Sequence, residues 1–276
     1  MTVSVHTNTS AMIALQNLTS TNKLLEDSQN RISTGLAVSS AKDNASVYAI
    51  AQGQRADLSS LDAVTESLNR ASSIADVAMS AGESVSDLLN QLREKVVGAM
   101  DGSIDTTSRN ALNSDFKSIL GQITNVVGNA TFNGANILDG SLTSSLSFIA
   151  NADASSSITL SVRDISLGGS IIQVSAGASL SSVAMSTTIL KQLDSSIDSL
   201  NANLGALGSQ SKQIEGHLTF VSKLSDSITG GIGNLVDADM AKESAKLQAL
   251  QVQQQLGTQA LSIANQAPQQ ILSLFK

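Results

Sequence analysis

The amino-acid sequence predicts a mainly α-helical protein: a long antiparallel helical bundle or coiled-coil rod with a central β-hairpin, and N- and C-terminal helices paired at one end. Three observations predict this fold class. Apolar residues recur at alternating spacings of three and four over long stretches in both halves of the chain. One proline occurs in 276 residues, so almost nothing interrupts helices. Near the middle, apolar and polar residues alternate, which is typical of strands.

Two long heptad seams predict the rod. The first seam is rich in alanine and runs from Leu61 to Ala99, and the second is rich in leucine and isoleucine and runs from Leu190 to Ile228. Large side chains of the second seam would face small ones of the first. A shorter helix near residues 107–127 would complete a three-helix bundle. The predicted rod core includes Leu61, Leu68, Val85, Leu89, Leu92, Leu193, Ile197, Leu200, Leu204, Leu207, Ile214 and Leu218.

The two ends of the chain repeat this spacing in a weaker form. Polar residues occupy seam positions, with Asn22 and Gln29 in the first segment and Gln254 in the last, and such residues tend to fix register and partner number. Two explanations stay open for how these apolar stripes are covered: by other copies of the chain, or by folding back onto the central bundle. The predicted assembly residues are Leu15, Leu18, Leu25, Ile32, Leu247, Leu250, Leu261, Ile271 and Phe275.

The middle of the chain predicts a β-hairpin. Asn133-Gly134 and Asp139-Gly140 are turn dipeptides, and the segments on either side of a polar loop at residues 151–156 alternate with period two. The predicted domains are therefore a terminal coiled-coil inner core (residues 1–40 and 235–276), a helical rod (41–130 and 179–234) and a hairpin part of the rod (131–178).

Composition disfavours several functional classes. Aromatic residues make up 2% of the chain, which favours thin layers between helices over a thick core. There is no cysteine, and thus no disulfide or thiolate chemistry. A net charge of −7 without a basic patch disfavours nucleic acid. No stretch approaches the roughly 18 apolar residues of a membrane span, and no cleavable signal is visible. This indicates a cytoplasmic protein or export by a route that reads no cleaved signal.

No catalytic, metal or cofactor site is predicted. The two histidines, His6 and His217, stand in different segments, and no metalloprotease, P-loop or nucleophile-elbow motif occurs. The glycines of GGIGNLVDAD (Gly230 to Asp239) could suggest a phosphate loop, and its aspartates a metal pair. The favoured interpretation is a break between two helices, with Asp237 or Asp239 capping the second. Gly35 similarly indicates a helix stop. We expect no enzyme activity and no cofactor.

Three separated segments resemble bacterial flagellins, in the correct order: RISTGLAVSSAKDNASVYAIAQGQRADLSSL, TFNGANILDG and ALSIANQAPQQILSLFK. The combination is most similar to the short flagellins of alphaproteobacteria. The resemblance implies a structural subunit that polymerises into the extracellular flagellar filament for swimming. It also implies terminal helices that pair on assembly and line the filament channel. The implied partners are other flagellin copies, the type III export apparatus with a chaperone, and the hook–filament junction and cap proteins.

The resemblance also bears on recognition and modification. Innate receptors of animals recognise many flagellins through a stretch that corresponds to LNQLREKVV (Leu89 to Val97). Arg93 matches the typical pattern, but Gln91 stands where arginine is usual and Lys95 where leucine is usual, which implies weak receptor activation. Serine and threonine are abundant in residues 141–186, where related flagellins are often O-glycosylated. An intact mass equal to the unmodified 28.4 kDa would exclude glycosylation.

Two alternatives to a flagellin remain open. Hook–filament junction proteins share the flagellin end motifs but are usually longer in the middle. A signalling coiled-coil rod, like the cytoplasmic rod of a chemoreceptor, would need uninterrupted helix to a tight tip and a membrane anchor. The predicted hairpin and the missing apolar span disfavour that alternative.

Overall fold

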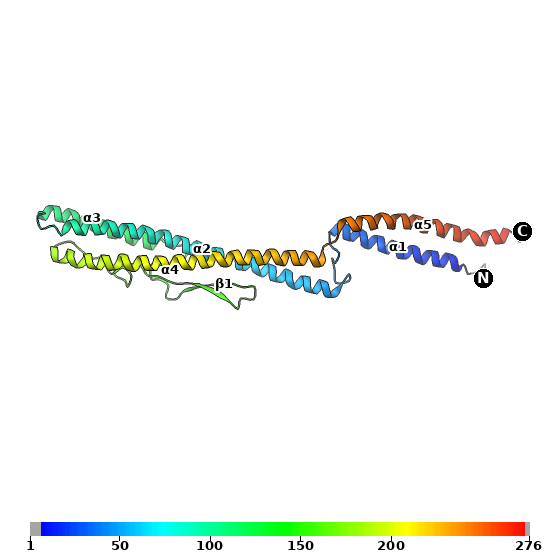
Figure 1. Cartoon of the computed structure of the whole chain (residues 1–276), viewed down its shortest axis with the longest axis horizontal. Coiled ribbons are helices and arrows are strands. Elements are labelled where there is room, and N and C mark those ends of the chain that lie inside the picture. The colour runs from blue at the N-terminus through cyan, green and yellow to red at the C-terminus, as the bar shows by residue number, and fades with distance from the viewer. Residues whose placement is uncertain (1–6, 274–276) are drawn as a thin grey trace. The chain divides into compact units, whose positions relative to one another are not determined.

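The computed structural model describes residues 7–273, and it describes side chains for residues 7–266. Within this part of the chain lie five long helices and one antiparallel two-stranded sheet (Figure 1). The predicted mainly α fold class with a central hairpin is confirmed. The chain divides into two compact units, which we call the terminal unit (residues 1–56 with 227–276) and the rod unit (57–226). Helices α2 (Ala45–Ala99) and α4 (Val183–Val236) each contribute to both.

The rod unit is built on α2 and α4, which run antiparallel. Met79 of α2 lies near Gly208 of α4, and further along the rod Arg93 forms an ion pair with Asp194 at 2.8 Å. Every apolar member of the predicted α2 seam is buried. The predicted core residues Leu61, Leu68, Val85, Leu89, Leu92, Leu193, Leu200, Leu207 and Ile214 are at most 2% exposed, whereas Ile197, Leu204 and Leu218 are half-buried.

Helix α3 (Thr106–Asn129) packs beside the end of α2. Asp105 caps it by accepting a hydrogen bond from the Ser108 amide at 2.9 Å. Arg109 near the start of α3 donates to the carbonyl oxygens of Ala99, the last residue of α2, and of Asp101 just beyond it, which satisfies acceptors at the C-terminal end of α2. One face of α3 is buried, through Phe116, Ile119, Leu120, Ile123 and Val127.

A sharp turn leads from α3 toward the hairpin. Asn133 and Gly134 have φ values of 49° and 79°, and the backbones of Phe132 and Ala135 exchange two hydrogen bonds of 3.0 Å around them. The buried side chain of Asn136 donates to the Val127 carbonyl at 2.7 Å, which ties the turn to the end of α3. Strands β1 (Leu146–Ile149) and β2 (Ser157–Leu160) then pair antiparallel, with Leu146 opposite Leu160.

Residues 146–174, which we call the strap, are hydrogen-bonded along α4. The contacts come from a polar stripe with a seven-residue period: Ser196, Asn203, Gln210 and His217. Their partners on the strap are, in the same order, the Gln173 amide (3.0 Å), the Arg163 guanidinium (2.5 Å), Ser161 (2.9 Å to its Oγ) and the Ala150 carbonyl (2.6 Å). Because the stripe keeps the heptad period, it faces one side of α4 throughout.

The terminal unit contains the antiparallel pair of α1 (Thr9–Thr34) and α5 (Met240–Ser273), which lie side by side in Figure 1. Near the chain ends the Asn8 side chain donates to the Ala264 carbonyl at 2.7 Å. Two predicted polar seam residues meet further along, where Gln254 donates to Asn22 at 2.8 Å. Helix α1 ends at Gly35, which has a φ of 72° and confirms the predicted stop.

The connection from α4 to α5 lies within residues 230–239, where a break between two helices was predicted. Helix α4 continues through the glycines at 230–233 to Val236, so the break falls at the end of that segment. Ile232 and Val236 of this part of α4 are buried against Ala51 of α2. This burial offsets the low helix propensity of the glycines. The chain leaves the helix only at residues 237–239. The predicted cap of α5 by Asp237 or Asp239 is made by Asp239, whose carboxylate accepts hydrogen bonds from the amides of Ala241 and Lys242.

Candidate assembly surfaces of the terminal helices

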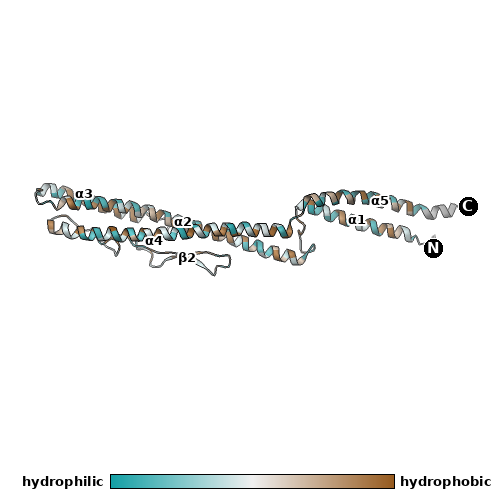
Figure 2. Ribbon diagram, in the orientation of Figure 1, coloured by the Kyte–Doolittle hydropathy of each residue, from teal (hydrophilic) through white to brown (hydrophobic). Residues whose placement is uncertain are grey.

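The terminal pair has two kinds of apolar side chain. Those that face the partner helix are covered within the chain: Leu250 is 5% exposed, and Leu18, Leu25, Ile32, Leu247 and Leu261 are half-buried. A second set is largely exposed in the single chain. We call this set the outer apolar surface, and it consists of Met12, Ile13, Leu15, Leu24, Val252, Leu256 and Ile263. Figure 2 shows apolar residues recurring along both helices.

The predicted assembly residues therefore fall into different places. Leu15, at 54% exposure, belongs to the outer apolar surface, whereas Leu250 lies inside the pair. The side chain of Ile271 and all of Phe275 lie outside the described residues. Sequence reasoning missed most of the outer apolar surface because a seam of threes and fours identifies only the face toward the nearest helix. The missed signal was a second set of apolar residues beside the seam, such as Ile13, Val252 and Ile263.

The outer apolar surface of α1 is hollowed. Met12, Leu15, Gln16, Thr19, Ser20 and Lys23 line a shallow open groove on this helix. A neighbouring hollow is lined by residues of both helices, including Ala11, Leu15 and Leu261. Exposed leucine and methionine side chains at half or more of their full area are costly to leave in water, so such surfaces mark sites of protein–protein contact.

A buried carboxylate joins the two helices near the start of α5. Glu243 is 7% exposed, and its Oε2 accepts from the Ser28 hydroxyl of α1 at 2.9 Å. Its Oε1 accepts from Arg31 at 3.2 Å, and Lys246 lies 3.7 Å from Oε2. Burial raises the pKa of the Glu243 carboxyl, but the hydrogen bonds from Ser28 and Arg31 and the charges of Lys246 and Arg31 outweigh it and lower the pKa overall.

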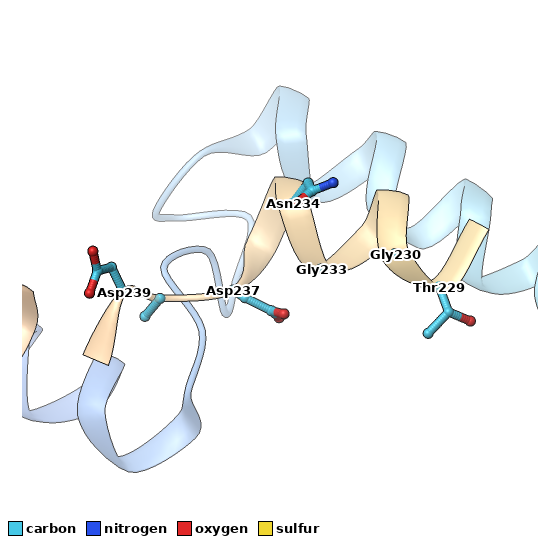
Figure 3. Close-up of a pocket in the computed structure, with 7 residues that line it drawn as sticks. Thr229, Gly230, Gly233, Asn234, Asp237 and Asp239 are labelled. Atoms are coloured by element: carbon cyan, nitrogen blue, oxygen red, sulfur yellow. The ribbon is translucent and has the colours of Figure 1, made fainter. Parts of the chain in front are cut away.

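The segment considered for phosphate or metal binding forms an open polar pocket on the α4–α5 connection (Figure 3). Thr229, Gly230, Gly233, Asn234, Asp237, Ala238 and Asp239 line it. Asp237 and Asp239 point away from each other, and Asp239 is engaged in capping α5. Within the described residues no group of three or more histidine, cysteine, aspartate or glutamate side chains could hold a metal ion. The pair of aspartates is thus explained by the helix boundary.

The remaining predicted positions lie on the rod. His217 is a strap contact of α4, and His6 lies outside the described residues. In the stretch aligned with the receptor motif, Gln91 is exposed, Arg93 is paired with Asp194, and Lys95 lies 3.5 Å from Asp115 of α3. Across the described helices, none has an apolar run long enough to span a membrane.

The helical rod and the antiparallel pair of terminal helices with exposed apolar side chains define a class of protein: an elongated, mainly helical structural subunit. Comparison with known sequences identifies the family. A profile of the bacterial flagellin N-terminal helical region matches residues 5–143, and one of the flagellin C-terminal helical region matches residues 190–275. The chain belongs to the bacterial flagellin family and is a structural subunit of the flagellar filament.

Full-length relatives agree with this assignment. Flagellin FljM of Caulobacter vibrioides is 49% identical over 99% of this chain and 98% of its own length. A flagellin of Brucella melitensis is 41% identical over 99% of both chains. The predicted resemblance to alphaproteobacterial flagellins is confirmed. Among solved structures, a putative flagellar hook-associated protein from Vibrio parahaemolyticus shares the fold, with a TM-score of 0.60 at 12% identity over 71% of this chain and 100% of that one.

Proposed function

We propose that the terminal pair is the inner assembly core of the filament and that neighbouring copies of the chain cover its outer apolar surface. The observation that carries this proposal is the division of apolar side chains on α1 and α5. One set is satisfied within the pair, and the other, including Leu256 at 64% exposure, has no cover in the single chain among the described residues. Burying such side chains is favourable by about 1.5–3 kcal/mol each, so copies that align these surfaces gain stability.

The proposed domains follow from this assignment. Residues 1–40 with 235–276 would form the inner core, residues 41–130 with 179–234 the surrounding helical tube, and residues 131–178 the hairpin on its outside. The chain catalyses no reaction in this proposal and needs no cofactor. The proposed function is assembly through the packing of side chains between subunits.

The proposed route and partners extend from family membership. The chain would be secreted unfolded by the flagellar export apparatus with the help of a chaperone. It would then add to a filament bounded by junction and cap proteins. The absence of cysteine is compatible with such a route, because no disulfide has to form or break in transit.

A matched pair of variants tests the assembly core. Leu256→Asp places a charge on the outer apolar surface, whereas Gln255→Asp adds the same charge at the neighbouring exposed position outside that set. We expect Leu256→Asp to abolish filament growth on seeds, measured by sedimentation and negative-stain electron microscopy, while circular dichroism shows the rod still helical. The Gln255→Asp chain should polymerise. Leu261→Asp and deletion of residues 260–276 should also block growth, and normal filaments from the truncated chain would refute the proposal.

A further inference from the structure

The buried contact at Glu243 has features that a passive packing contact lacks. Its carboxylate is the main polar link between the last turns of α1 and the first turn of α5, with both oxygens engaged by groups of α1. Ser28, which donates to Oε2, is fully buried. Among the described residues, Glu243 forms ion pairs with Arg31 of α1 and with Lys246 of α5 itself. Every one of these contacts favours the ionised carboxylate.

Helix position adds to the same preference. Glu243 stands in the first turn of α5, where the unpaired amides of a helix start favour negative charge. Protonation would remove the charge that Arg31, Lys246 and the helix start all stabilise. It would also leave two donors, the Ser28 hydroxyl and the Arg31 guanidinium, facing a weaker acceptor in a site with little access to water.

The main chain next to this site fixes where the helices meet. Directly after α1, the Ala37 amide donates to the Val236 carbonyl at 2.7 Å, and the Ala238 amide donates to the Gly35 carbonyl at 2.9 Å. These backbone bonds contain no titratable group. Beside this point, the Glu243 carboxylate adds an ionisable side-chain link between α1 and α5.

We propose that Glu243 is an acid-sensitive latch: its ionised carboxylate holds α1 against the start of α5, and its protonation releases the terminal pair and with it the filament. The direction of the pH dependence follows from the lowered pKa of the Glu243 carboxyl. The lowered pKa means that the paired state binds the proton less tightly than the released state. The latch therefore contributes fully above the ordinary carboxyl value of 4.5 and is lost as the pH falls through the lowered value.

The test uses filaments of the full chain, since the latch rests on the proposed assembly core. Filaments of the unaltered chain and of three variants are titrated with acid, and the sedimentable fraction is measured at each pH. Arg31→Met keeps the carboxyl but removes its cation, so its disassembly midpoint should move to higher pH. Glu243→Gln cannot be ionised, so it should need about tenfold more protein to assemble at pH 7 and depend less on pH. Glu26→Gln removes an exposed carboxyl of α1 and should behave like the unaltered chain.

A second measurement links disassembly to the terminal pair. The chain has no cysteine, so spin labels at Asn22→Cys and Gln254→Cys, whose side chains are in contact, report the α1–α5 distance in filaments diluted with unlabelled copies. The distance should lengthen over the same pH range as disassembly. An unchanged midpoint in Arg31→Met, or disassembly with the label distance intact, would overturn the latch while leaving the assembly core untouched. Failure of the unaltered chain to polymerise would instead contradict the proposed function.

Discussion

Gly82 of α2 lies directly beneath Leu204 of α4. A Cβ atom added to this buried glycine would clash with Leu204 Cδ2, since it would lie well inside van der Waals contact, and it would lie 3.5 Å from Leu204 Cγ. The absence of a side chain at this one position, in a seam otherwise formed by alanine, valine and leucine, thus makes room for a leucine from the partner helix. Large side chains of α4 facing small ones of α2 was the complementarity predicted from the two seams.

Gly82→Val should destabilise the rod by about 2 kcal/mol, because a branched side chain cannot fit beneath Leu204 without displacing it. Urea denaturation followed by circular dichroism measures the change. Gly205→Val is the matched control on α4, since a Cβ at Gly205 meets nothing within 4 Å. Equal stability of the two variants would show that the close approach carries no energetic weight.

Truncating side chains of the polar stripe should weaken the attachment of the strap to α4 while the helices stay intact. Asn203→Ala leaves the Arg163 guanidinium without its 2.5 Å acceptor, and His217→Ala leaves the Ala150 carbonyl without its donor. Each loss should lower the local opening free energy by about 1 kcal/mol. Hydrogen exchange of the amides of residues 146–160 measures it. Thr219→Ala, which removes a hydroxyl bonded only within its own helix at 3.0 Å, should leave the exchange rates unchanged.

The cap of α3 should make rod stability depend on acid pH. Hydrogen bonds from the side chain and backbone of Ser108 lower the pKa of the Asp105 carboxyl below its ordinary value of 3.8. The stabilisation is therefore present above that value and fades as the pH falls through the lowered one. Asp105→Asn keeps a capping side chain that does not titrate. At pH 7 the urea midpoint of the Asp105→Asn chain should be equal to or below that of the unaltered chain. Between pH 7 and pH 3 its free energy of unfolding should fall by less than that of the unaltered chain. An equal loss in both chains would contradict this role.

Purified monomer should activate the animal innate receptor for flagellin only weakly. Gln91 and Lys95 depart from the pattern of flagellins that signal strongly, and Arg93 and Lys95 are each held in an ion pair on the rod. The double variant Gln91→Arg with Lys95→Leu should raise the response of a receptor-reporter cell line, because it restores both positions. Glu66→Gln, on the exposed face of the same helix, serves as the control. Strong signalling by the unaltered chain would overturn the prediction.

The helical rod could be predicted from sequence because it depends on local and periodic properties, whereas the flagellin family was indicated by the resemblance of three separated segments. The α2 seam from Leu61 to Ala99 is buried as predicted, since a sustained heptad pattern leaves only one face that can be removed from water. Gly35 and the Asn133-Gly134 turn were also predictable, because few other residues adopt their positive φ. Each of these features needs no knowledge of distant residues.

The tertiary structure decided which residues far apart in the chain meet. No local pattern indicates that Glu243 is buried against Ser28, or that α4 continues through Gly230 and Gly233 because Ile232 packs on Ala51. The polar stripe from Ser196 to His217 has a visible period, but its partners on the strap depend on the path of the hairpin. Sequence by itself determined the seams and turns, which are set by chain geometry. Only the fold decided which face of α1 and α5 is left uncovered, because exposure depends on where the partner helix lies.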